Sequence, residues 1–221
     1  MIPALLQPVF APNLYDLACI KRADKVFLAD THQWSRKGRV HRAVIRTPGG
    51  TAYINIPVVT EDRKKPIHKV RIDQSDDWIT PLLRSLSYNY RNSRYFDFYE
   101  PEITADFQAG ESFEYLLPFL LSLRYRLYRY LEVPFEKKEI LLSRSDEYPD
   151  DPDKLLRTLG ADKLFQEHSS RHYMKQSGSK VEPEFNHPVY YQHFEGFEKY
   201  CCAYDLLFQM GPESFKILDQ I

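Results

Sequence analysis

The sequence predicts an α/β protein with a mostly parallel, Rossmann-like sheet that carries an inserted β-hairpin and a helical middle segment. Three observations favour this class. A strand, a helix and a second strand follow one another within the first 29 residues, which is typical of a parallel βαβ unit. The same alternation returns after Pro134. Two β-rich runs and a long helical stretch separate these two parts.

The first βαβ unit is bounded by clear signals. Residues 3–6 are apolar and predict a buried strand, which ends at Gln7 and Pro8 because proline cannot continue a ladder. Residues 12–23 carry apolar side chains at helical spacing, with Asn13 as the expected cap. Residues 25–29 predict a second buried strand.

A hairpin and a helical segment are expected next. Residues 41–47 and 51–59 are β-rich and flank Pro48, Gly49 and Gly50, a combination that indicates a hairpin. Residues 69–72 are expected to add a third strand. Residues 76–131 have leucines and aromatics at helical spacing, and Pro118 predicts a kink or a helix that starts near it.

The second βα-rich part is expected to complete the sheet. It consists of strands at 139–143, 163–166 and 180–185 and of helical pieces at 152–159 (ended by Gly160), 168–175, 201–210 and 215–221. We expect residues 1–221 to form one domain, with a hairpin region at about 40–72 and a helical insertion at about 76–131.

Composition narrows the classes of protein. The net charge of −1 gives no basic field for nucleic acid, although residues 124–130 interleave arginines with tyrosines. The odd cysteine count, with two cysteines adjacent, predicts reduced thiols in a reducing compartment. We find neither a signal peptide nor an apolar run long enough for a membrane span. These features indicate a cytoplasmic protein.

Cofactor and metal motifs are weak. No glycine-rich phosphate loop is present, so the cofactor stays unassigned. His168 and His172 are four residues apart and could share a helix face, with His187 and His193 as further ligands. Two polar residues on a surface helix explain the same spacing, and we predict no metal site.

Polar residues at the carboxyl ends of the predicted strands are the first place to look for a site. The basic residues after Asp30 are Arg36, Lys37, Arg39, His41 and Arg42. They could hold a phosphate or a carboxylate, or they could be a solvated loop. The sequence leaves both alternatives open.

Six segments, in order along the chain, resemble the motifs of the WbqC-like protein family. They are LQPVFAP from Leu6, DTHQW from Asp30 with Arg42 and Ile45 to Pro48, the tyrosine-rich run around Tyr90, GAD from Gly160 to Arg171 and Tyr173, HPVYYQ from His187, and YDLLF from Tyr204.

The resemblance implies a bacterial protein of surface-polysaccharide biosynthesis, with a transferase that moves an aminoacyl or acyl group onto an amino sugar. The expected partner is a small-molecule substrate such as a nucleotide-activated sugar. The candidate catalytic residues are Asp30, as base or orienting group, and His187. The candidate substrate-binding residues are Gln7, Gln33, Arg42, Arg171, Tyr173 and Gln192, with the two arginines as anion clamps.

Three departures from the family pattern keep an alternative open. Leu6 and Leu82 stand where the family has histidines, and residues 167–170 replace a Ser-Gly turn. Under this alternative, the chain is a non-catalytic or catalytically degenerate protein of the same fold that binds a small molecule or another protein. In either case we expect Gln7, Asp30, Gln33, Arg42, Arg171 and His187 to converge on one cleft.

Overall fold

The structure is a computed structural model that describes residues 1–133, 139–168 and 170–221. Pro134, at the expected start of the second βα-rich part, and Ser169, within the expected helix 168–175, lie outside the described residues. The strands of the described part are β1 (Ala4–Leu6), β2 (Val26–Leu28), β3 (Arg42–Thr47), β4 (Gly50–Asn55), β5 (Glu139–Leu141), β6 (Leu164–Gln166) and β7 (Lys180–Val181). Its α-helices are α1 (Leu14–Arg22), α2 (Ile79–Tyr90), α3 (Phe96–Gln108), α4 (Leu116–Tyr130), α5 (Pro152–Leu159), α6 (Ala203–Met210) and α7 (Phe215–Leu218).

A five-stranded sheet in the order β5-β2-β1-β6-β7 forms the centre of the fold, and all its pairs are parallel. The register places Leu5 opposite Phe27 on one side and opposite Gln166 on the other. After β1 the chain adds β2 and β5 on one side of β1, and it later adds β6 and β7 on the other side. The predicted α/β class with a Rossmann-like parallel sheet is therefore confirmed.

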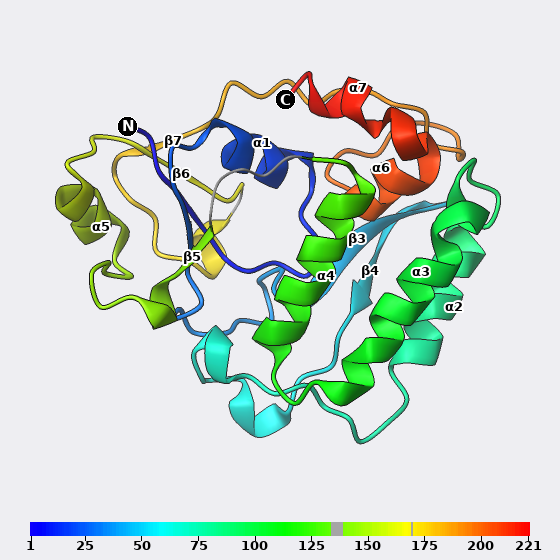
Figure 1. Ribbon diagram of the computed structural model, residues 1–221, viewed down its shortest axis with the longest axis horizontal. Helices are drawn as coiled ribbons and strands as arrows, with labels where there is room; N and C mark the ends of the chain where they lie inside the picture. Colours follow the sequence, from blue (N-terminus) through cyan, green and yellow to red (C-terminus); the bar gives the residue numbers. More distant parts are fainter. Residues whose placement is uncertain (134–138, 169) are drawn as a thin grey trace.

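Both faces of the sheet are covered, because successive strand side chains point to opposite sides. Leu6 and Leu28 belong to the large hydrophobic core that includes the apolar face of α1. Leu5 and Phe27 belong to a smaller core with leucines of α5. Figure 1 shows α1 and α5 with the sheet between them. The two central strands β1 and β2 are apolar throughout because each is buried on both faces.

The hairpin of β3 and β4 is a separate two-stranded sheet. Its strands contact α6 and α2, and α4 contacts both α3 and α6. Figure 1 shows the hairpin extending from the region of the main sheet towards these helices. The large core continues without a break from the sheet to this layer, so the hairpin and helices are packed on the same apolar interior as the sheet.

Local sequence signals account for several element ends. The Asn13 side chain caps α1 by accepting from the N–H of Asp16, whose carboxylate accepts from the N–H of Asn13. This reciprocal pair satisfies two N–H groups that a helix start would leave unpaired. Gly160 ends α5 in the left-handed conformation with φ of 62°. Pro118 lies in the first turn of α4, where its missing N–H costs nothing.

Three expected elements are wrong in type or length. Residues 69–72 form no strand of the sheet; the chain makes a 3₁₀ helix at Ile67–Lys69, and the Arg71 N–H donates to the Asp62 carboxylate. Within the described part of 168–175 only Ser170–His172 is helical, as a 3₁₀ turn. The strand expected at 180–185 is β7 alone, since Pro183 has no N–H for the ladder.

The topology places the switch point of the sheet between β1 and β6, where the connections turn to opposite sides. Ligands of open α/β sheets commonly bind beyond the carboxyl ends of the strands at such a point. Here Gln7 follows β1 and Glu167 follows β6. The functional site is therefore sought around these two residues and the loop that follows β2.

Candidate functional site

A buried ion-pair cluster lies at the switch point, beside the carboxyl ends of β1 and β6. Arg39, from the loop after β2, donates from Nη1 and Nη2 to the two Asp16 carboxylate oxygens at 2.7 and 2.6 Å. Its Nη2 also lies 3.2 Å from Glu167 Oε2. Both carboxylates are buried. A forked pair of this kind is geometrically specific, so Arg39 connects the loop to the start of α1 and to the end of β6.

Glu167 connects three further parts of the site. Its Oε1 accepts from the N–H of Gln7 at 2.6 Å, which joins the ends of β1 and β6. Its Oε2 accepts from the Tyr173 hydroxyl at 2.7 Å. Burial and the neighbouring Glu167 raise the pKa of Tyr173, so its hydroxyl stays protonated as the donor. Glu167 thus contributes a buried carboxylate that joins β1, β6 and Tyr173.

Three of the expected binding residues meet around Gly38. A Cβ atom at this position would lie 3.2 Å from Gln7 Oε1 and 3.5 Å from Tyr173 Cδ2. Arg42 Nε donates to the Gly38 carbonyl at 3.0 Å. Gln7 is 1 % exposed, and within the described structure neither atom of its amide has a hydrogen-bond partner. A buried unpaired amide is costly, so Gln7 is the polar group of this cluster that a ligand or a bound water would stabilise most.

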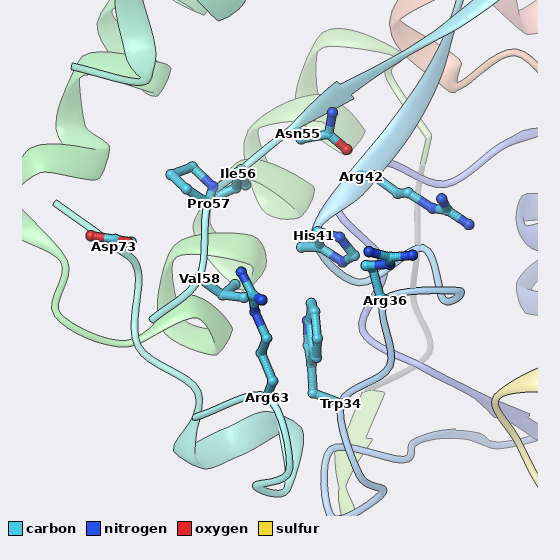
Figure 2. Close-up of a pocket in the computed structure, with 10 residues that line it drawn as sticks. All are labelled: Trp34, Arg36, His41, Arg42, Asn55, Ile56, Pro57, Val58, Arg63 and Asp73. Carbon is cyan, nitrogen blue, oxygen red and sulfur yellow. The ribbon is translucent and has the colours of Figure 1, made fainter. Parts of the chain in front are cut away.

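A cavity of about 390 Å³ opens on the other side of the same loop, and we call it the arginine pocket. Figure 2 shows its lining, which comes from the loop after β2, the two hairpin strands' ends and the segment after β4. The lining residues are Trp34, Arg36, His41, Arg42, Asn55, Ile56, Pro57, Val58, Arg63 and Asp73.

Three guanidinium groups and one carboxylate give the arginine pocket a positive character. Arg42 is held by the carbonyls of Gly38 and Lys37, at 3.0 and 2.7 Å, and lies over the Tyr53 ring at 4.3 Å. Arg36 and Arg63 are exposed and line the pocket from separate segments. Guanidinium groups bind phosphates and carboxylates through paired N–H donors. The arrangement is suited to an anionic small molecule.

The backbone segment that carries Arg63 is held by the buried carboxylate of Asp62. Asp62 is fully buried and accepts from Arg71 Nε at 2.8 Å and from Lys65 Nζ at 2.5 Å. The backbone of this segment also pairs with the loop after β2, since the Trp34 N–H donates to the Lys65 carbonyl at 3.0 Å. The two arginine-bearing segments are therefore fixed relative to each other.

Trp34 and His41 form the floor of the pocket between the arginines (Figure 2). Their rings lie 4.7 Å apart between centroids. Within the described structure, Trp34 Nε1 and His41 Nδ1 are buried without a hydrogen-bond partner. Burial, together with Arg42 and Arg63, lowers the pKa of His41 to about 4. The imidazole is accordingly neutral at physiological pH, and a pKa this low makes it a weak proton acceptor.

Asp30 lies at the carboxyl end of β2 and is fully buried. Its Oδ1 accepts from the Ser143 N–H at 2.9 Å, and its Oδ2 accepts from the Ser143 hydroxyl. Its carbonyl accepts from the His68 N–H. The carboxylate thus joins the ends of β2 and β5, and its role as a catalytic base stays a prediction.

His187 and Gln192 lie in a second polar region, formed by the chain before α6. His187 Nδ1 is 2.9 Å from the Pro188 carbonyl, which can only accept, and Nε2 accepts from the Tyr200 N–H at 3.2 Å. Gln192 donates to the buried Asp205 carboxylate at 2.8 Å. His187 is thus held by groups of this segment, and Gln192 by a carboxylate of α6.

The other two expected binding residues are exposed. Arg171 donates to the neighbouring His172 at 3.4 Å. Gln33 is exposed and forms an isolated backbone bridge to Pro66. Of the six residues expected in one cleft, the contacts bring Gln7 and Arg42 together at Gly38, with Asp30 at the adjacent strand end. They place His187 among partners from its own segment.

The basic cluster predicted after Asp30 contains Arg36, His41 and Arg42 of the arginine pocket. It does not contain the other two charged lining residues, Arg63 and Asp73. These two come from the segment between the hairpin and α2, which no periodicity connects to the loop after β2. The basic run of Arg63, Lys64 and Lys65 was the only local signal available.

Among the described residues, no group of three or more histidine, cysteine, aspartate or glutamate side chains has the arrangement of a metal site. None of the helices traced there combines the length and hydropathy that a bilayer crossing requires.

The Asp30 contacts generate a test. Asp30→Ala leaves the Ser143 N–H and hydroxyl without their acceptor, and we expect the free energy of unfolding to fall by about 2–3 kcal/mol. Ser143→Ala removes only one of the two bonds and should cost about 1 kcal/mol. Urea unfolding of both variants measures this. An Asp30→Ala protein as stable as the wild type would contradict the structural role and favour the catalytic one.

The His41 environment generates a second test. As pH falls below the ordinary value of 6.5, the unfolded chain takes up a proton at His41 that the folded chain accepts only near 4. The contribution of neutral His41 to the free energy of unfolding is thus fully present above pH 6.5. It falls by on the order of 2 kcal/mol as the pH falls towards 4. His41→Phe keeps the contact with Trp34 and should lose less stability between about pH 7 and pH 4.5. Equal losses in urea unfolding would count against a buried neutral His41.

Comparison with known proteins agrees with the motifs identified in the sequence. The model of the WbqC-like protein family matches residues 7–217, which is nearly the whole chain. Searches among curated proteins and among solved structures found no match. The matched range contains the strand ends, the loop after β2, the hairpin and α6, and thus both polar regions described above. The chain belongs to the WbqC-like protein family.

Proposed function

We propose that this protein binds a nucleotide-activated amino sugar in the arginine pocket and transfers an acyl or aminoacyl group to its amine, as a cytoplasmic step of bacterial surface-polysaccharide biosynthesis. The observation that carries the proposal is the meeting of Arg36, Arg42 and Arg63 around one cavity of about 390 Å³. Two linked phosphates carry the charge and oxygen geometry that such a set binds.

The transfer chemistry requires a proton acceptor near the anion. The sugar amine attacks the carbonyl carbon of the donor, a C–N bond forms, the bond to the leaving group breaks, and the amine loses a proton. The pocket arginines hold the diphosphate in this proposal, and they orient the sugar amine for the attack. His41 is a candidate for the proton acceptor because it lines the pocket and is unprotonated at neutral pH, even though its low pKa makes it a weak base. Asp30 and His187 stay as alternative candidates, although their side chains have partners in Ser143, Pro188 and Tyr200.

The three cysteines support the proposed location. Cys19, Cys201 and Cys202 are buried and free. Free thiols persist in reducing compartments, whereas exported proteins commonly pair them.

A non-catalytic binding protein of the same fold is the second candidate. Leu6 and Leu82, at the family's histidine positions, are 2 % and 5 % exposed and belong to the hydrophobic core. At the switch point Glu167 pairs with Arg39. These replacements remove imidazoles and place a paired carboxylate at the strand ends, while the arginine pocket is left open. Binding without turnover is the behaviour that this candidate predicts.

The arginines provide the test. Arg36→Ala and Arg63→Ala alter exposed side chains, so we expect folding to be unaffected. Each should weaken the binding of uridine diphosphate glucosamine about tenfold, because each removes a charge-assisted hydrogen bond worth about 1.5 kcal/mol. Arg84→Ala removes an equal charge from the exposed face of α2 and is the matched control.

Calorimetric titration measures these affinities, and mass spectrometry after incubation with glycine and ATP detects an aminoacylated sugar. Unchanged affinity in both pocket variants would refute the proposed binding site. Tight binding with no new product would favour the non-catalytic candidate over the transferase.

A further inference from the structure

A second cavity adjoins the arginine pocket, and we call it the apolar groove. It has a volume of about 350 Å³ and lies between β4 and α2. Its apolar lining consists of Tyr53, Ile54, Pro57, Trp78, Pro81 and Leu82. Asn55 and Pro57 line both cavities, so the groove and the pocket share a wall. A ligand that extends past this wall would place an anionic part beside an apolar part.

A cation–π contact between Arg42, which lines the pocket, and Tyr53, which lines the groove, lies at the boundary of the two cavities. The Tyr53 ring lines the groove and is 52 % exposed, and the Arg42 guanidinium, which lines the pocket, lies 4.3 Å from the ring centroid. The guanidinium covers one face of the ring and leaves ring surface accessible. An exposed aromatic ring next to an arginine is a typical surface for stacking a planar group.

The groove also carries polar groups at its margin. Asn55 and Ser85 line it alongside the apolar side chains. Asn55 is exposed and Ser85 is half-buried. An amide and a hydroxyl can pair with the edge of a nucleobase, whose donors and acceptors are fixed in its plane. A hydrocarbon chain would leave both groups without partners.

We propose that the apolar groove is a nucleobase subsite and that a nucleoside diphosphate binds across both cavities. The base stacks in the groove against Tyr53, with its edge towards Asn55 and Ser85. The diphosphate lies on Arg36, Arg42 and Arg63. This inference rests on the proposed function for the anion and adds the part of the ligand that gives it specificity.

The test compares ligands that share the diphosphate. Uridine diphosphate and adenosine diphosphate supply a base, inorganic pyrophosphate supplies none, and farnesyl diphosphate supplies an apolar chain. At least one nucleotide should bind about tenfold or more tighter than pyrophosphate, which is the order of one base–aromatic stacking contact. Calorimetric titration at fixed ionic strength measures all four.

Two variants locate the subsite. Tyr53→Ala removes the stacking ring and should cost the nucleotide about tenfold in affinity. Ser85→Trp fills the groove from α2 without touching Arg42, and it should abolish the nucleotide's advantage while pyrophosphate still binds. Tyr88→Ala, on the same helix and 71 % exposed, is the control and should change nothing. Retained pyrophosphate binding also reports that each variant is folded.

Each outcome has a distinct meaning. If pyrophosphate binds but neither nucleotide binds more tightly, the nucleobase subsite is refuted and the arginine pocket stands. If farnesyl diphosphate binds more tightly than both nucleotides, the groove takes a lipid chain and the inference is overturned. If no diphosphate binds the wild-type protein, the proposed function itself fails.

Discussion

The pairing of Arg39 with two buried carboxylates is the interaction on which the site depends. Asp16 belongs to the cap of α1, and Glu167 follows β6 and also binds the N–H of Gln7 after β1. One guanidinium therefore joins three elements of the main sheet layer to the loop after β2. The cost of desolvating these charges is large, and it is offset only while all three groups stay in place. The cluster is a constraint on geometry more than a source of stability.

Because of this constraint, the arginines of this region have two different roles. Arg39 is paired with the protein's own carboxylates at the switch point, which is where open α/β sheets commonly bind a ligand. Arg36 comes from the same loop and Arg42 begins β3, and both line the cavity together with Arg63 (Figure 2). The open cavity, where we propose that the ligand binds, therefore lies at the junction of the loop, the hairpin and the following segment rather than at the sheet edge. The loop is held on one side by Arg39 and on the other by backbone bonds to residues 65–68.

Much of the fold could be predicted because its signals are local. The Asn13 cap, the apolar strands around α1 and the Gly160 terminus of α5 each follow from a few adjacent residues. The basic residues of the loop after β2 could be identified as a candidate site for the same reason. Arg63 could not be assigned to this site, because its position depends on the burial of Asp62 and on backbone pairing with a loop that is distant in the sequence. The expected strand at 69–72 failed on the same ground: the Arg71 N–H bonds to a carboxylate that local pattern does not reveal.

If Arg39 fixes the loop by neutralising two buried carboxylates, replacing it by methionine should destabilise the fold. Arg39→Met retains much of the apolar stem but leaves Asp16 and Glu167 buried without their cation. We expect this variant to lose about 3–5 kcal/mol of unfolding free energy in equilibrium urea unfolding at neutral pH, whereas Arg84→Met, on the exposed face of α2, should lose almost none. Equal stability of the two variants would show that Arg39 does not hold the loop in this way.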